Sequence, residues 1–232
     1  MISKNIEEVN KNIEESCRRS GRDPASVKLI AVSKTKPAES IKEAYECGCR
    51  SFGENYVQEL IQKYDELPKD IEWHMIGHLQ RNKVKYVIGK VSLIHSVDSL
   101  RLAQEINDRS AKTGIVTDIL AEVNVSEEEN KYGFAPDEVS EFAFQMPDLK
   151  NIRLKGLMTS APFVTDPEEN RRFFKILREL SVDIDKKNID NVMMKELSMG
   201  MTGDYKVAVE EGATMVRVGT AIFGARDYGG IS

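Results

Sequence analysis

Cysteine is scarce in this 232-residue sequence. The cysteines present are Cys17, Cys47 and Cys49, and such a small, odd number does not suit a disulfide framework. A single residue separates Cys47 from Cys49, which is neither the spacing of a CxxC redox motif nor that of half a zinc site. The three histidines are scattered and form no HExxH pattern. We therefore expect ordinary thiols in a reducing cytoplasm and no metal site.

Long hydrophobic runs and an excess of positive charge are also missing. No stretch of 18 apolar residues occurs, and residues 1–8 alternate charged and apolar positions without the apolar core of a secretory signal. The net charge is −5 and the pI about 5.5, which gives no general attraction to nucleic acid. With 41% hydrophobic residues and no linker or low-complexity stretch, residues 1–232 are expected to fold as one domain with neither a nucleic-acid nor a membrane partner.

Short apolar or β-rich segments alternate along the chain with segments of helical spacing. An opening helix carries apolar residues from Ile6 to Cys17 and ends near Gly21. The eight candidate strands are 27–34, 50–54, 72–77, 92–97, 117–124, 153–158, 194–199 and 214–218. This alternation favours an α/β fold, a (β/α)8 barrel with an extra N-terminal helix. Because segment 50–54 is short and 79–90 is rich in charge, a seven-stranded or open sheet is the alternative.

Unusual residues follow the predicted strands, at the end of a barrel where functional groups gather. They are Lys34, Lys36, Asn55, His78, Asp98, Asn124, Thr159, residues 198–202 and residues 217–220. A lysine at a strand end can form a Schiff base with an aldehyde, and turns of glycine and hydroxyl residues can hold a phosphate. A phosphorylated aldehyde needs both, and pyridoxal 5′-phosphate (PLP) is the common one.

Each of these signals also has an ordinary explanation. A lysine at a strand end is most often a solvated surface residue, and a lone Gly-Thr turn is usually an ordinary connection. Lys34 and Lys36 share one face of their segment, so periodicity does not choose between them. His74 and His95 lie within apolar strands and are expected to be packed, hydrogen-bonded core residues, whereas His78 is as well suited to lining a site as to an ordinary loop.

The sequence resembles the pyridoxal phosphate homeostasis proteins, a PLP-binding family related to the N-terminal barrel of alanine racemase. The resemblance rests on stretches that run in the expected order from end to end of the chain: AVSKTKP (31–37), FGENYVQE (52–59), WHMIGHLQRNK (73–83), KGLMT (155–159), LSMGMTGD (197–204) and MVRVGTAIFGARDY (215–228). At Thr202 serine is commoner in the family, but threonine keeps the hydroxyl.

The resemblance implies a set of cofactor contacts and no catalytic residue. Lys34 would form the Schiff base, Arg217 would face the pyridine nitrogen, and Asn55 would lie near the ring edge. The phosphate would be held by Ser198, Gly219 and Thr220, beside a wall that includes Met199 and Gly200. Chemistry agrees for Arg217, because a guanidinium can only donate and would keep the ring nitrogen unprotonated.

The function implied is that of a non-catalytic PLP-binding protein of intracellular vitamin B6 homeostasis and amino-acid and keto-acid balance. Apo forms of PLP-dependent enzymes would be its partners. The alternative is a racemase-like PLP enzyme with weak activity. Alanine racemase takes a second base, a tyrosine, from a separate domain and a partner subunit, whereas the barrel expected here occupies the chain up to residues 229–232. We therefore expect binding without turnover, and a monomer.

Overall fold

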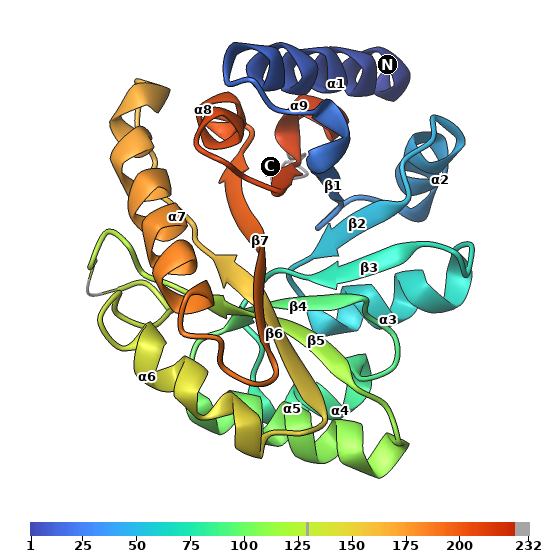
Figure 1. Ribbon diagram of the computed structural model, residues 1–232. Helices are drawn as coiled ribbons and strands as arrows, with labels where there is room; N and C mark the ends of the chain where they lie inside the picture. The colour runs from blue at the N-terminus through green and yellow to red at the C-terminus, as the bar shows by residue number, and fades with distance from the viewer. Residues whose placement is uncertain (129, 226–232) are drawn as a thin grey trace.

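Eight parallel strands form a closed barrel in which each strand pairs with its neighbour in sequence and β1 pairs with β8 (Figure 1). The structure is a computed structural model and describes residues 1–128 and 130–225; the last residues of the 215–228 motif and the stretch 229–232 lie outside the described residues. The strands are β1 (Lys28–Val32), β2 (Ser51–Glu54), β3 (Glu72–Met75), β4 (Leu93–Val97), β5 (Thr117–Glu122), β6 (Ile152–Met158), β7 (Val192–Met201) and β8 (Met215–Val218). The predicted (β/α)8 barrel is confirmed, and the open or seven-stranded alternative is wrong.

Helices cover the outside of the barrel (Figure 1), and short 3-10 turns precede α4 and α7. The helices are α1 (Ile2–Arg19), α2 (Ala38–Glu46), α3 (Val57–Glu66), α4 (Val84–Val87), α5 (Leu100–Thr113), α6 (Val139–Phe144), α7 (Arg171–Asp185), α8 (Tyr205–Glu210) and α9 (Thr220–Phe223). The predicted extra N-terminal helix is α1, whose buried stripe from Ile2 to Cys17 packs against α2, α8 and α9. Within the described residues no helix is both long and apolar enough to cross a membrane.

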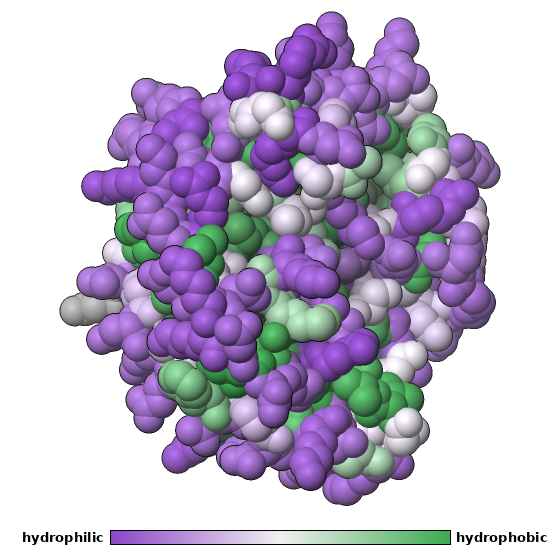
Figure 2. All heavy atoms as spheres, viewed as in Figure 1, coloured by the Kyte–Doolittle hydropathy of each residue, from purple (hydrophilic) through white to green (hydrophobic). Residues whose placement is uncertain are grey.

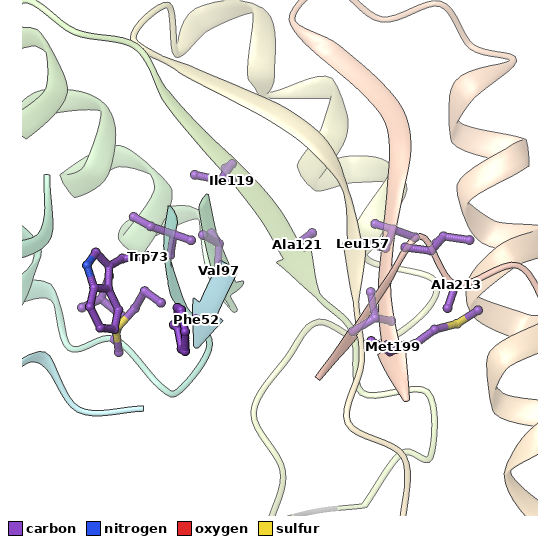
Figure 3. Packing of buried hydrophobic residues seen from close by; sticks show 14 of the residues in the cluster. Phe52, Trp73, Val97, Ile119, Ala121, Leu157, Met199 and Ala213 are labelled. Atoms are coloured by element: carbon purple, nitrogen blue, oxygen red, sulfur yellow. The ribbon is translucent and has the colours of Figure 1, made fainter. Parts of the chain in front are cut away.

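The hydrophobic core has two parts because strand side chains alternate between the outside and the inside of the barrel. The larger part lies between strands and helices and includes Phe52 and Trp73, whose ring centroids are 6.0 Å apart (Figure 3). The smaller part is a separate cluster of Ile30, Leu93, Leu120, Met158 and Met215. These residues point to the barrel interior.

A polar layer lies above this inner cluster. His95, Glu122 and Arg217 stand two positions beyond Leu93, Leu120 and Met215 on the same strands, and they face the same side. The inner cluster thus lies below a polar layer that is nearer the carboxyl ends of the strands. The face shown in Figure 2 is mostly hydrophilic, with hydrophobic side chains in smaller patches among the hydrophilic ones.

Candidate functional site

A cavity of about 530 Å³ lies at the carboxyl ends of the strands. Its volume is within the range of roughly 300–1,000 Å³ that is usual for sites of small ligands. Five residues of the predicted set line it: Lys34, Asn55, Arg217, Gly219 and Thr220. The fold therefore brings together side chains that are up to 186 positions apart, since 220 − 34 = 186.

The other three predicted residues lie outside the cavity wall. Ser198 is fully buried, and its hydroxyl contacts Arg217 and His95. Met199 belongs to the core between barrel and helices (Figure 3). Gly200 has φ +91°, and a Cβ there would lie 2.5 Å from the Cβ of Ala208, so glycine is needed for the close approach of β7 to α8.

Thr202 also lines the cavity; the sequence places it among the strand-end residues but not among the expected cofactor contacts. Its hydroxyl oxygen lies 3.3 Å from the backbone nitrogen of Gly219 and 3.5 Å from that of Ala221, at the start of α9. Two N–H groups and a rotatable hydroxyl therefore converge at one edge of the cavity. Such a group of donors suits an anion.

Lys34 stands in a turn that is fixed on both sides. The backbone nitrogen of Lys36 donates to the carbonyl oxygen of Ser33 at 3.0 Å, and Thr35 has φ +62°, which a β-branched residue rarely adopts. The Thr35 N–H donates to Oε2 of Glu59 at 2.8 Å. The side chain between these anchors lines the cavity.

A buried ion cluster lies beneath that turn. The Lys63 ammonium donates to the carbonyl oxygen of Ser33, to Oε1 of Glu54 and to Oε2 of Glu59, at 2.8, 2.8 and 2.9 Å. Glu54 is fully buried and also accepts from the Ser33 hydroxyl at 2.6 Å. Burial raises the pKa of Glu54, and the Lys63 charge opposes that rise. The ion cluster ties β1, β2 and α3 together under Lys34.

Lys36, the alternative to Lys34, is directed elsewhere. Its ammonium donates to the carbonyl oxygens of Phe223, Gly224 and Ala225 at 3.1, 3.2 and 3.1 Å, where α9 ends. A lysine at a helix C-terminus satisfies carbonyls that have no partner within the helix. The geometry thus separates two lysines that periodicity left equivalent.

The Arg217 side chain is buried, with 4% of its surface exposed, and its guanidinium is held by hydrogen bonds to residues of β7 and of the segment that follows β6. Nη1 donates to the carbonyl and hydroxyl oxygens of Ser198 at 2.7 and 2.6 Å, and Nη2 donates to the carbonyl oxygen of Thr159 at 2.7 Å and to the Ser160 hydroxyl at 3.4 Å. Burial lowers the pKa of Arg217 to about 10, with the Glu122 charge opposing, so the side chain stays cationic at neutral pH.

Among the described residues, the buried side-chain oxygens without a hydrogen-bond partner include Oδ1 of Asn55 and Oδ1 of Asn170, which line the cavity, and Oε2 of Glu122, which is not part of its lining. Burial and the Asp98 charge raise the pKa of Glu122 to about 7, and Arg217 opposes that rise. Buried polar atoms are usually satisfied, so the two asparagine oxygens suit a ligand or water with donors of its own.

The three histidines divide as their sequence context suggests. His74 and His95 are buried, with Nδ1 of His74 lying 2.9 Å from Nε2 of His95, which confirms packed, hydrogen-bonded core residues. His78 lies outside the cavity wall, stacked on Tyr132 and 3.1 Å from Asp98. In residues 1–128 and 130–225, no group of three or more His, Cys, Asp or Glu side chains is arranged to hold a metal ion.

Comparison with known proteins places the chain in a family. Residues 5–227 match the family described as alanine racemase, N-terminal domain. The curated pyridoxal phosphate homeostasis protein of Aquifex aeolicus is 47% identical over 96% of this chain and 97% of its own length, and that of Escherichia coli K12 is 40% identical over 98% and 97%.

Solved structures agree. PipY of Synechococcus elongatus with PLP bound is 35% identical over 97% of this chain and all of its own, with a TM-score of 0.83. Alanine racemase of Corynebacterium glutamicum, 15% identical, shares the fold with a TM-score of 0.67 over 62% of its own chain. The resemblance found in the sequence is confirmed: this chain belongs to the pyridoxal phosphate homeostasis proteins, within the family of alanine racemase N-terminal barrels.

Proposed function

We propose that this protein binds PLP without catalysing a reaction and serves intracellular PLP (vitamin B6) homeostasis and amino-acid and keto-acid balance. The observation that carries the proposal is the cavity itself, which joins the amine of Lys34, the guanidinium of Arg217 and the donor group around Thr202. The homeostasis name of curated relatives that match over 97% of their own length supports the same conclusion.

The residues present fit the cofactor. When bound, PLP supplies an aldehyde that condenses with an amine and a pyridine ring that withdraws electrons. Lys34 is the amine that lines the cavity. We propose that the Thr202 hydroxyl and the N–H groups of Gly219 and Ala221 hold the phosphate, with Thr220 beside them. Asn55, with its unpartnered buried oxygen, would accept a hydrogen bond at the ring edge.

Arg217 would donate to the ring nitrogen. Both Nη groups already donate to protein oxygens, and a guanidinium carries five N–H groups, so Nε–H is the donor that none of the described residues uses. Because a guanidinium does not accept, the ring nitrogen stays unprotonated and withdraws fewer electrons. Arg217 therefore bears on how the ring is held and does not by itself separate binding from catalysis.

The remaining parts of the proposal concern organisation. We propose that residues 1–232 act as one domain, since the barrel closes within the chain from β1 to β8. We also propose a cytoplasmic monomer whose partners are PLP and apo forms of PLP-dependent enzymes. The curated relative of Aquifex aeolicus is named for PLP homeostasis, and delivery of PLP to such enzymes is the part of homeostasis that we propose.

Solvent deuterium exchange at the α-carbon of alanine and serine tests binding against turnover, because it detects proton removal even without net product. We expect PLP to bind, as seen by its visible absorbance, with exchange far below the roughly 1–10³ per second of dedicated enzymes. Lys34→Ala is the control. Exchange at enzyme-like rates that disappears in Lys34→Ala would establish the racemase-like alternative instead.

A further inference from the structure

A row of buried side chains runs inward from Arg217 through the barrel. Nη1 of Arg217 lies 2.6 Å from Oγ of Ser198, which lies 2.8 Å from Nδ1 of His95, and Nε2 of His95 lies 2.9 Å from Nδ1 of His74. The four residues come from β8, β7, β4 and β3, and none is more than 4% exposed. We call this row the inner relay.

The guanidinium sets the direction of every hydrogen bond in the inner relay. Arg217 can only donate, so Ser198 Oγ accepts from it. Among the described residues the other partner of that hydroxyl is Nδ1 of His95, so the hydroxyl proton goes there. His95 then carries its proton on Nε2 and donates to Nδ1 of His74.

The opposite direction leaves more groups unsatisfied. If His95 donated from Nδ1, the Ser198 proton would have no acceptor among the described residues, and His74 Nε2 would be a buried acceptor without a partner. In the direction set by Arg217, the Nε2–H of His74 is the one group of the inner relay left without a hydrogen-bond partner among the described residues. Unsatisfied buried groups are costly, so the direction with fewer of them is favoured.

The inner relay also requires both imidazoles to be neutral. Burial lowers the pKa of His74 to about 4, helped by the Lys28 charge and opposed by Glu72. Burial lowers the pKa of His95 as well, with His74, Arg217 and Lys28 adding to the effect. An uncharged row next to Arg217 therefore adds no second cation to the barrel interior.

We propose that Ser198 and His95 are positioning residues that fix the Arg217 guanidinium, so that its Nε–H meets the ring nitrogen of bound PLP; this rests on the proposed function. Of the two Nη1 acceptors, the Ser198 hydroxyl is the one that can rotate. His95 removes that freedom by taking the hydroxyl proton. Ser198 therefore acts through Arg217 and does not contact the phosphate.

The first test needs no ligand. Long-range 15N–1H NMR of histidine-labelled protein reports which ring nitrogen carries the proton. We expect neutral rings protonated on Nε2 for both His74 and His95 between pH 6 and 8. A proton on Nδ1 of His95, or a charged ring at neutral pH, would overturn the inner relay whether or not PLP binds.

The second test compares PLP with its N-methylated pyridinium derivative, which cannot accept from Arg217. We expect Ser198→Ala to weaken PLP about three- to tenfold and shift its visible band, in line with one lost hydrogen bond, while leaving affinity for the derivative unchanged. Ser198→Thr should restore the band. Ser96→Ala is the matched control, because the buried Ser96 hydroxyl donates to the carbonyl oxygen of Gly77.

Two results would separate the possible failures. Equal losses for both ligands in Ser198→Ala would mean a merely structural role and would overturn the positioning proposal. Failure of the unaltered protein to bind PLP would instead sink the proposed function, and the NMR result would still decide whether the inner relay runs in the inferred direction.

Discussion

Two buried cations, Lys63 and Arg217, are compensated differently by the residues around them. Lys63, under the Lys34 turn, contacts two carboxylates, Glu54 and Glu59. Arg217 contacts carbonyl and hydroxyl oxygens and no carboxylate among the described residues. The charge of Lys63 is thus neutralised in place, whereas that of Arg217 is oriented but left to act on a ligand. We propose that the first arrangement holds the turn, whereas the second orients Arg217 so that it can donate to the ring nitrogen of PLP.

Removing the Lys63 ammonium should give the largest effect. Lys63→Met keeps an unbranched apolar side chain but leaves the fully buried Glu54 carboxyl without its cationic partner. Breaking one partner of a buried ion pair costs about 3–5 kcal/mol. Urea unfolding should show that loss, and Lys63→Met combined with Glu54→Gln should recover part of it.

The control is Lys186→Met, whose exposed pair with Asp183 should be worth less than about 1 kcal/mol. A Lys63→Met loss no larger than this control would mean that the ion cluster does not hold the turn.

Glu122 should make stability fall between pH 5 and 7. Its pKa is raised from 4.5 to about 7 by folding, so the folded state holds the proton more tightly. The stabilisation is complete below 4.5 and is lost as the pH rises through 7, amounting to about 3 kcal/mol at most. Urea unfolding at pH 5, 6, 7 and 8 should show this slope, and Glu122→Gln should remove it.

His74 contributes the opposite slope, because its depressed pKa means that stability is lost as the pH falls from 6.5 through about 4. The difference in unfolding free energy between the unaltered protein and Glu122→Gln, measured at each pH, gives the contribution of the Glu122 carboxyl alone. Glu128→Gln is the control, since hydrogen bonds from Lys131 and Ser126 lower the pKa of Glu128 below this range. An unchanged slope in Glu122→Gln would refute the assignment.

The phosphate donors should matter by about one order of magnitude each. Thr202→Val and Thr220→Val should weaken PLP about tenfold, or about 1.4 kcal/mol, because a charge-assisted hydrogen bond is lost. Pyridoxal, which lacks the phosphate, should bind much more weakly than PLP. Its affinity should be the same for the unaltered protein and for both variants. Equal affinities of the unaltered protein for pyridoxal and PLP would remove the phosphate from this edge of the cavity.

Thr35→Gly should give the smallest effect. A non-glycine residue at φ +62° is strained by about 1 kcal/mol, and glycine relieves this while adding freedom to the unfolded chain. We expect a net stabilisation below about 1 kcal/mol in urea unfolding. Thr165→Gly, at an exposed residue whose φ is not positive, should destabilise by about 0.5–1 kcal/mol. A similar loss in both variants would contradict strain at Thr35.

The barrel could be predicted because its evidence is local. The alternation of inward and outward side chains, such as Leu120 and Ile119, can be read within a single strand. Because functional groups of such barrels lie at the carboxyl ends of the strands, Lys34, Asn55 and Arg217 could then be placed on one face. The boundary errors are small: β7 was expected at 194–199 and spans Val192–Met201.

The partners within the site could not be predicted, because they depend on register between distant strands. β7 advances three residues, from Ser198 to Met201, while β8 advances two, from Met215 to Arg217. Ser198, which contacts Arg217, and Thr202, which lines the cavity, lie on either side of that irregularity, and no local sequence pattern reveals it. Lys63 likewise resembles an ordinary surface lysine of a helix until α3 is packed against β2.

Borohydride reduction of the protein with PLP, followed by peptide mapping, tests the central claim most directly. Reduction fixes the cofactor on the amine that it meets in the cavity. The account predicts label on Lys34, and Lys34→Ala should lose both the label and the visible band. Lys36, whose ammonium is held by three carbonyl oxygens, should stay unlabelled. Label on Lys36 in the unaltered protein would contradict the account.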